Sequence, residues 1–254
     1  MALVSTDAVL LRSHPYSDSS RILRFYTAEL GLVGVMARGV RSRGAKGSGG
    51  LELLRSGKLT VYVRPGRDLQ TFKEFSADEF LPTLGSDPLL LAGGSVLAEL
   101  VLRHAGSDAN PELFAALLNC LASLPAAVAI EPTGAILARA WYLVGTLGYL
   151  PEVEHCVQCG RALAESPDEI CLFDFSAGGL RCAACSEGVQ GPRLVPESRA
   201  RLLQFLSGSS SPEPMARPAA HLTLLDEFVT YHISGGQPMK SMGVLRALLE
   251  ARHA

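Results

Sequence analysis

The fold of the N-terminal region is decided by one stretch, LLRSGKLTVYV, at residues 53–63. Apolar and polar side chains alternate along it and just past its end, with Leu59, Val61 and Val63 on one face and Lys58, Thr60, Tyr62 and Arg64 on the other. A period of two residues is typical of a β-strand that buries one face. The stretch therefore predicts a strand whose apolar face lies against a core.

Other short runs of β-prone residues surround this strand, at residues 8–11, 22–27, 33–37 and 69–75. Turn-rich pieces separate them, including residues 17–20 and the pair Pro65-Gly66. Five short strands within about 75 residues are typical of a small closed barrel. The pattern fits a five-stranded OB-fold, and an SH3-like barrel has the same signature.

After residue 85 the apolar period becomes helical. Asp87-Pro88 and Asn110-Pro111 each place a capping side chain before a proline at the first helical position. Pro132 is placed to open a third helix that ends near Gly148. Helical patterns return at residues 196–206, 216–234 and 240–251.

These patterns divide the chain into four parts. Residues 1–80 are expected to form the barrel, residues 81–149 and 191–254 the two parts of a helical body, and residues 150–190 a cysteine-bearing segment. We therefore predict an α+β multidomain protein in which the cysteine segment is inserted into, or attached to, an all-helical body.

The cysteine segment contains Cys156-x2-Cys159 followed, after 22 residues, by Cys182-x2-Cys185. Two residues between paired cysteines let both thiolates bend toward one ion, and Gly160 suits the tight turn that this requires. Four thiolates complete the tetrahedral shell of Zn²⁺ and leave no open position. The spacing therefore predicts a zinc ribbon that holds one structural ion.

Two disulfides or four unrelated thiols are the alternative interpretations of these cysteines. The N-terminus lacks the pattern of a signal peptide, and a reducing cytoplasm favours metal binding over disulfides. Cys120 lies on a helical apolar face and Cys171 in a β-like run, so we expect both in the core. His155 adjoins Cys156, but four sulfurs already fill the metal shell.

Charge is distributed unevenly along the chain. Residues 1–75 carry 12 Lys and Arg against 6 Asp and Glu, whereas the whole chain has a net charge of −2. The remaining residues are therefore acidic overall. A basic domain attached to an acidic body is typical of a protein that holds phosphates with one face.

Basic residues are densest between Arg38 and Lys73, where several adjoin glycines that let the backbone approach a phosphate chain. The ring of Tyr62, beside Lys58 and Arg64, can stack on a base. An ordinary solvated face is the alternative interpretation of such a charge run. The candidate nucleic-acid-binding residues are Arg38, Arg41, Arg43, Lys46, Arg55, Lys58, Tyr62, Arg64 and Arg67.

Catalytic motifs do not stand out in this sequence. Zinc-protease, serine-hydrolase and clustered-carboxylate patterns are missing, and the six histidines are dispersed. Residues 39–44, GVRSRG, resemble the beginning of a phosphate-binding loop, but Ala45 occupies the position of its lysine. We expect no enzyme, and any strand rearrangement must be driven by binding energy. No uninterrupted apolar run approaches the length needed to cross a bilayer, so no membrane partner is expected.

Several motifs occur in a fixed order along the chain: AVLLR at 8–12 with DSSRIL at 18–23, ARGVR at 37–41, GYLP at 148–151 before the two cysteine pairs, and KS at 240–241 with LR at 245–246. Together they resemble the bacterial RecO family of recombination mediators over most of the chain. The resemblance implies an N-terminal OB-fold, a helical body and a zinc ribbon. It also adds Arg21 to the expected DNA contacts, beside Arg38 and Arg41.

The resemblance further implies a function in DNA repair and recombination. Such a protein binds single- and double-stranded DNA, anneals complementary strands and, with RecR and RecF, helps RecA to load on DNA covered by single-strand-binding protein (SSB). Contact with the acidic SSB tail is also implied, and Arg103 and Arg139 are candidates for the rim of its apolar cleft. The expected location is the cytoplasm, at the nucleoid.

Two other functions remain open at this point. One is a zinc-ribbon scaffold or transcription accessory protein that uses the barrel for protein docking, and the other is a metal-dependent enzyme with an open zinc position. A scaffold would not bind random single strands, and a catalytic metal would leave folding largely intact when Cys159 is replaced.

Overall fold

The computed structural model describes residues 2–39, 51–78, 84 and 87–253. The chain forms two compact units, Met1–Pro125 and Ala126–Ala254. Their boundary falls at a proline inside a helix.

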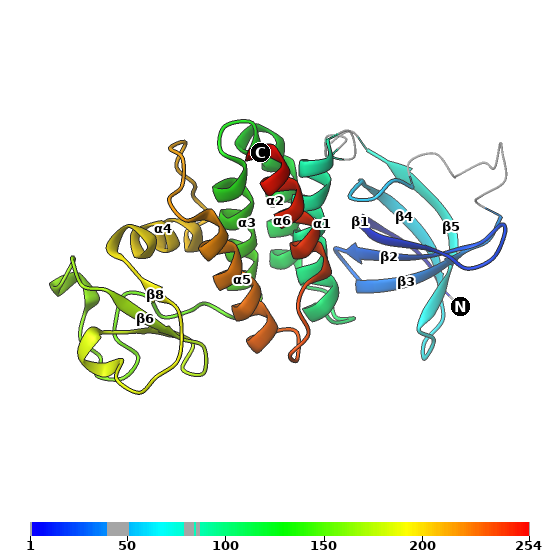
Figure 1. Cartoon of the computed structure of the whole chain (residues 1–254). Coiled ribbons are helices and arrows are strands. Elements are labelled where there is room, and N and C mark those ends of the chain that lie inside the picture. Colours follow the sequence, from blue (N-terminus) through cyan, green and yellow to red (C-terminus); the bar gives the residue numbers. More distant parts are fainter. Residues whose placement is uncertain (1, 40–50, 79–83, 85–86, 254) are drawn as a thin grey trace. The chain divides into compact units, whose positions relative to one another are not determined.

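In its described part the first unit contains a closed barrel of five strands (Figure 1). They are β1 (Ala2–Pro15), β2 (Arg21–Thr27), β3 (Gly31–Ala37), β4 (Ser56–Val63) and β5 (Leu69–Ala77). Their order is β1-β2-β3-β5-β4, because the long β1 pairs antiparallel with both β2 and β4, while β3 and β5 run parallel. This is the arrangement of an OB-fold, so the predicted fold class is confirmed and the SH3-like alternative is wrong.

Alternate residues of these strands form the barrel core. Leu59 and Val61 are fully buried and Val63 packs against the same cluster, as the alternation predicts. The rings of Phe25 and Phe75 pack together with centroids 5.1 Å apart. Burial of these apolar side chains is the main force that closes the barrel.

The alternation also predicts Thr60 on the exposed face of β4, and this is wrong. Only 7% of Thr60 is exposed. It lies opposite Ser5 of β1, and the two hydroxyl oxygens are 3.3 Å apart. Pairing with the long β1 covers this position, which the pattern of a single strand does not report.

The predicted strand over residues 53–63 begins later, at Ser56. The residues before it form a turn in which Leu54 has a φ of 64°, a value that is strained for a residue with a side chain. Leu54 is buried and reaches α1 (Pro88–His104), where a Cβ on Gly94 would lie 2.5 Å from its Cδ1. Burial of this side chain offsets the strained backbone.

Both helix starts predicted in the first unit are confirmed. Asp87 caps α1 by accepting hydrogen bonds from the N–H groups of Leu89 and Leu90. Asn110 accepts a hydrogen bond from the N–H of Leu113 at the beginning of α2 (Pro111–Val128). These side chains satisfy N–H groups that have no partner within the helix.

By length and composition α2 could cross a membrane, with 18 residues and a mean hydropathy of 1.5; it is the one such helix in the described part of the chain. The expectation that no segment reaches this length is therefore not met. Leu117 and Leu121 of α2 are fully buried in the folded chain. A buried core helix has the same composition, so this feature is weak support for a membrane span.

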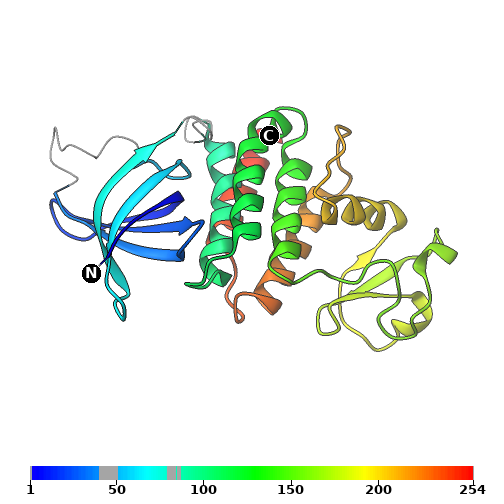
Figure 2. The same ribbon diagram turned by 180° about the vertical axis from the view of Figure 1, so that it is seen from behind.

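The second unit is built around α3 (Pro132–Thr146), which packs against α4 (Pro196–Leu206) and α5 (Pro218–His232). α6 (Lys240–His253) packs against α5 (Figure 2). The single tryptophan of the chain, Trp141, is fully buried in α3, and its ring centroid lies 5.1 Å from that of Phe228.

The cysteine segment of this unit contains a small sheet of order β7-β6-β8. Its strands are β6 (Cys171–Asp174), β7 (Gly179–Arg181) and β8 (Arg193–Leu194). The ring of Phe173 in β6 is fully buried and lies 5.9 Å from that of Phe228 in α5. This aromatic contact packs the sheet against the helices of the same unit.

Candidate nucleic-acid groove and candidate metal centre

The four predicted metal ligands come together in the cysteine segment. The Sγ atoms of Cys156, Cys159, Cys182 and Cys185 all lie within 4.8 Å of one another, and those of Cys159 and Cys182 are 3.9 Å apart. A tetrahedral zinc–thiolate site with bonds of about 2.3 Å has sulfur–sulfur edges of about 3.8 Å. The cluster therefore has the size and the donor set of a closed site for one metal ion.

Two tight turns hold the sulfurs in place. The N–H of Gly160 donates to the carbonyl of Cys156 at 2.8 Å, and the N–H of Cys185 donates to the carbonyl of Cys182 at 3.0 Å. Gly160 has a φ of 73°, a conformation that favours glycine, as the sequence predicts for this turn. The N–H of Cys182 also donates to Sγ of Cys156 at 3.4 Å, which links the two turns.

The thiols of this cluster differ in acidity. Burial acts to raise the pKa of Cys156, but the N–H groups of Cys182, Cys159 and Gln158 donate to its sulfur and lower the pKa to about 6. Hydrogen bonds with Cys182 and Cys159 instead raise the pKa of Cys185 to about 12. Because thiolates rather than thiols bind metal, binding of a cation at the centre would release protons from these cysteines.

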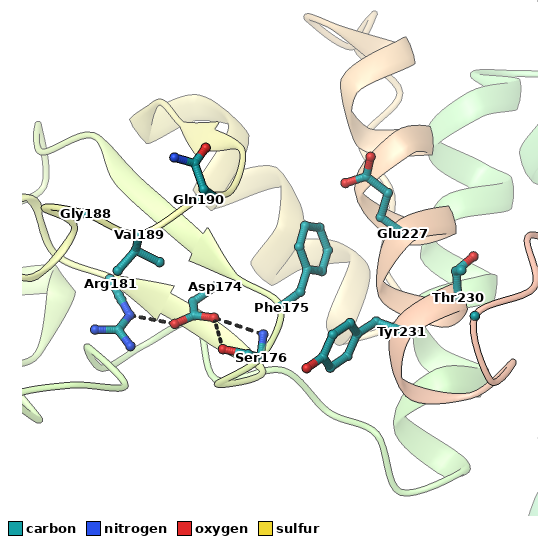
Figure 3. A pocket seen from close by; sticks show the side chains of 11 residues that line it. Asp174, Phe175, Ser176, Arg181, Gly188, Val189, Gln190, Glu227, Thr230 and Tyr231 are labelled. Carbon is teal, nitrogen blue, oxygen red and sulfur yellow. Dashed lines mark hydrogen bonds and ion pairs between the residues drawn. The ribbon is translucent and has the colours of Figure 1, made fainter.

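A buried ion pair supports the second cysteine turn (Figure 3). Asp174 of β6 and Arg181 of β7 are 2.7 Å apart, and Asp174 also accepts hydrogen bonds from the hydroxyl and the N–H of Ser176. Burial acts to raise the pKa of Asp174, but these partners lower it to about 2. The pair lies in the wall of a cavity of about 690 Å³, and it fixes the backbone that leads into Cys182.

A second ion pair supports the other side of the cluster. Glu169 lies 2.6 Å from Nη2 of Arg161, and its other oxygen accepts a hydrogen bond from the N–H of Ala183 at 2.8 Å. Both arginines beside the cysteine turns, Arg161 and Arg181, are therefore neutralised by carboxylates. This agrees with a structural rather than a DNA-binding role for the segment.

The remaining cysteines and the neighbouring histidine lie outside the cluster. Cys120 is buried in α2, and Cys171 is fully buried with Nη1 of Arg199 3.5 Å from its sulfur. His155 is exposed, and its Nδ1 lies 3.7 Å from a carboxylate oxygen of Glu152. Their placement outside the metal site agrees with the prediction from sequence.

A groove of about 640 Å³ lies on the outer face of the barrel. Its lining comes mainly from β2, from β3 and from the turn between β4 and β5, with Ser107 of the loop between α1 and α2. Among these residues are Arg24, Gly34, Gly66, Arg67 and Asp68. OB-folds bind oligonucleotides on the face of strands 2 and 3, next to the loop between strands 4 and 5. The groove thus occupies the position at which this fold holds nucleic acid.

Arg24 and Arg67 bring two guanidinium groups to this groove. Within the part of the chain that the structure describes, neither side chain forms an ion pair or a hydrogen bond. Asp68 is the acidic residue that lines the same groove, so the lining carries net positive charge. Guanidinium groups bind phosphate oxygens through two parallel hydrogen bonds, and both are available for this here.

One side chain holds the turn that carries Arg67. Gln70 accepts a hydrogen bond from the N–H of Arg64 at 2.7 Å and donates to the carbonyl of Arg67 at 2.8 Å. Within the turn Gly66 has a φ of 74°, as a type II turn with Pro65 before it requires. The predicted turn thus presents Arg67 on a supported backbone.

The other described candidates on β4 are spread along the strand. Lys58 lies near its beginning, where its amine is 2.8 Å from a carboxylate oxygen of Asp7. Arg64 follows the end of β4 and lies about 20 Å from Lys58, because six residues separate them and a strand rises about 3.3 Å per residue. Tyr62 is half-buried on the outer face and does not line the groove. The structure therefore does not bring these residues together.

The remaining candidates lie at other positions. Arg38 is exposed directly after β3, and Arg55 is half-buried before β4. Arg21 is the first residue of β2. It lies on the same face of the strand as Leu23 and Phe25, which point into the barrel. The last three, Arg41, Arg43 and Lys46, lie outside the described residues.

Two family models match nearly the whole chain. The model described as recombination protein O N terminal matches residues 1–79, and the one described as recombination protein O C terminal matches residues 85–242. The chain belongs to the recombination protein O family. The resemblance seen in the sequence is confirmed.

Named relatives in the recombination protein O family agree over almost their full length. The DNA repair protein RecO of Anaeromyxobacter sp. (strain K) is 31% identical over 248 residues, which cover 92% of both chains. That of Nocardioides sp. (strain ATCC BAA-499 / JS614) is 30% identical over 94% of this chain and 98% of the relative. That of Prosthecochloris aestuarii (strain DSM 271 / SK 413) is 28% identical over 96% and 97%.

Sequence reasoning missed one groove residue of this recombination protein O chain, Arg24. It precedes the dense basic run, so charge density does not select it. The alternation along β2 does carry a signal, because Leu23 and Phe25 point into the core and the residue between them must face outward. Its place beside Arg67, however, depends on how the barrel closes.

Proposed function

We propose that this chain is a DNA repair and recombination mediator that binds single- and double-stranded DNA through its barrel. One observation carries the proposal. Arg24 and Arg67 both line the groove at which an OB-fold holds oligonucleotides, and neither forms an ion pair with a carboxylate of a described residue. Membership of the recombination protein O family and the names of its relatives, which are DNA repair proteins, support it.

The proposed mechanism uses binding energy alone. Cations in the groove neutralise phosphates on one strand and so lower its repulsion toward a second strand. Bases of the bound strand stay free to pair, because the cations contact phosphates and leave the base edges unoccupied. Complementary strands can then anneal without a nucleotide fuel, and the protein acts as a mediator rather than an enzyme.

We propose that the four cysteines hold one Zn²⁺ ion with a structural role. Four thiolates fill the tetrahedral shell, and the closed cluster leaves no position for a reacting ligand. The ion would cross-link the two cysteine turns, and such sites contribute about 10–16 kcal/mol to folding in peptides. Because the three strands of this segment are only two to four residues long, the ion would supply much of its stability.

The partners proposed for this chain come from the family resemblance. They are RecR and RecF, with which the chain would assist the loading of RecA on SSB-covered DNA in the cytoplasm, at the nucleoid. The proposed binding of single strands by the barrel is consistent with such a role, because a mediator must hold the strand from which SSB dissociates. Contact with the SSB tail would bring the chain to that strand.

A cavity in the second unit supports contact with the SSB tail. It has a volume of about 340 Å³ and is lined by the apolar side chains of Leu222 and Leu249. Two charged residues also line it, Glu250 and Arg246, and Nη2 of Arg246 lies 3.3 Å from a carboxylate oxygen of Asp226. An acidic tail with an aromatic end requires an apolar cleft with a cation nearby. Neither Arg103 nor Arg139, the candidates from sequence, lines this cavity.

Fluorescence annealing of complementary strands by the full chain, with and without SSB, tests the proposed function. We expect annealing without nucleotide, and we expect Arg24→Gln with Arg67→Gln to slow it about tenfold, since a hydrogen bond to a charged group contributes about 1.5–3 kcal/mol. Lys73→Gln is the matched control, because it removes a barrel cation that lies outside the groove. A chain that neither binds nor anneals random strands would instead be the protein-docking scaffold.

A further inference from the structure

A second cationic cavity lies in the second unit, between β8, α4 and the beginning of α5. It has a volume of about 50 Å³. Its lining comes from eight residues, Pro192, Arg193, Leu194, Ser198, Arg217, Ala220, His221 and Leu224. Two of them are arginines and none is acidic, so the lining carries net positive charge.

The arginines of this cavity are not neutralised. Arg193 and Arg217 are both exposed, and neither guanidinium forms an ion pair with a described residue. The arginines beside the cysteine turns differ in this respect, because each of them is held by a carboxylate. Arg193 and Arg217 are therefore free to bind an anion from solution.

The beginning of α5 adds to the positive potential. Arg217 caps the helix with a φ of 55°, and no side chain accepts a hydrogen bond from the first turn. Pro218 has no N–H, and the N–H groups of Ala220 and His221 donate to the carbonyl of Arg217 at 3.0 and 3.4 Å. The contribution of this helix end is therefore the positive end of its dipole, which favours an anion. Because Arg217 and Ala220 line the cavity, it opens on the first turn of α5.

His221 provides a second and independent indication of a ligand. It is 3% exposed and lines the cavity. Its ring stacks edge-on against Phe205, with centroids 5.6 Å apart, and no described residue forms a hydrogen bond with its side chain. A buried imidazole normally has a hydrogen-bond partner. A ligand oxygen in the cavity would supply one.

We propose that this cavity binds a terminal phosphate group, held by Arg193, Arg217 and His221 at the beginning of α5. A cavity of this volume has room for a few water molecules, which suits one tetrahedral oxyanion. An internal phosphodiester carries two ester-linked sugars, whereas a terminal phosphate carries one or none. The cavity therefore fits free phosphate or the phosphate at the end of a DNA strand.

The first test measures the melting temperature of the full chain in increasing inorganic phosphate, with sodium chloride adjusted to hold ionic strength constant. We expect a rise in Tm that saturates, because the folded state alone binds the ion. In a chain labelled at histidine, the ring resonances of His221 should shift over the same concentrations. A Tm that follows ionic strength alone would overturn the proposal.

Two substitutions locate the effect. Arg217→Gly removes a guanidinium and keeps the fold, because glycine tolerates the φ of 55° at this position. Arg193→Gln removes the other. Each should weaken the apparent affinity for phosphate about tenfold. Lys240→Gln, a charge-matched change in the same unit outside the cavity, should leave it unchanged. An equal response to phosphate in all three variants would overturn the proposal.

The source of the phosphate is distinguished with oligonucleotides, an arm that rests on the proposed DNA binding. If the ligand is a strand end, a 5′-phosphorylated oligonucleotide should bind more tightly than its 5′-hydroxyl counterpart, and Arg217→Gly should abolish the difference. Equal binding of both, with a saturating response to inorganic phosphate, assigns the cavity to the free ion. Failure of DNA binding alone would leave the phosphate response intact and so reject only the proposed function.

Discussion

The guanidinium of Arg24 lies directly over Gly34, so that a Cβ on Gly34 would come within 2.7 Å of Nη1 of Arg24. The same Cβ would come within 2.9 Å of the carbonyl oxygen of Asp68. The two residues face each other in the register of β2 and β3. Glycine at position 34 therefore lets Arg24 lie flat on the sheet and lets the turn with Arg67 approach it.

Gly34→Ala should weaken DNA binding. The side chain of Arg24 can move aside, but the backbone at Asp68 cannot do so without shifting the turn, at a cost of about 1–3 kcal/mol in stability. We expect affinity for a single-stranded oligonucleotide to fall about fivefold in fluorescence anisotropy, which is about 1 kcal/mol. Gly243→Ala in α6, with open space around it, is the control: it should leave DNA affinity unchanged, and it should stabilise its helix by about 1 kcal/mol rather than destabilise the chain.

Gln70→Ala should release the turn that carries Arg67. The substitution removes the hydrogen bonds to the N–H of Arg64 and to the carbonyl of Arg67. Because these groups are exposed, stability should fall by only about 1 kcal/mol, whereas DNA affinity should fall severalfold as the turn loses its fixed position. Gln204→Ala on α4 provides the matched surface change. Unaltered affinity in Gln70→Ala would mean that the turn needs no such support.

Cys159→Ser should abolish metal binding and unfold the cysteine segment while leaving the barrel able to bind DNA. Three thiolates no longer complete a closed shell, and the segment loses its main cross-link. Elemental analysis should give one zinc per wild-type chain, and limited proteolysis of the variant should cut within residues 150–190. Cys120→Ala, outside the cluster, should keep the ion. Full folding of Cys159→Ser without metal would contradict a structural ion.

Acid should destabilise the second unit through His221. Burial, reinforced by the charge of Arg201, lowers its pKa from 6.5 to about 4. Below about pH 6.5 the imidazole of His221 is protonated in the unfolded chain, but in the folded unit it stays neutral down to about pH 4. The free energy of unfolding therefore falls as pH is lowered through this window. The expected loss between about pH 7 and about pH 5 is about 2 kcal/mol.

Urea unfolding followed by the fluorescence of Trp141, the single tryptophan, measures this loss in the unit that contains both residues. His221→Gln should flatten the pH dependence, because the titrating group is gone. His155→Gln removes an exposed histidine of the same unit and should leave the dependence unchanged. A wild-type curve without slope between the two pH values would show that His221 takes up its proton in the folded state.

Local patterns predicted the elements of this fold well. Asp87 and Asn110 were recognisable as caps because the capping side chain and the proline after it lie within three residues of the groups they serve. The cysteine spacing was equally informative, since each tight turn needs only its own four residues. Short-range chemistry of this kind is visible in a sequence without an account of the fold.

The assembly of the groove could not be predicted in the same way. Arg24 meets the turn with Arg67 only because β3 and β5 pair in parallel, with Gly34 opposite Leu69. Lys58 in turn is paired with Asp7 because β1 and β4 are neighbours in that register. Counting charges along the chain therefore identified the basic unit, while barrel closure determines which of its cations face one groove.

The most direct test of this account is the salt dependence of single-strand binding by Arg24→Gln with Arg67→Gln, compared with the wild-type chain. If about six cations contact phosphates, log K should fall with log salt at a slope near −4 in the wild type. Loss of two contacts should reduce the magnitude of that slope by about 1.4 and weaken binding about tenfold or more. The same affinity and the same slope in both proteins would contradict the groove as the DNA-binding site.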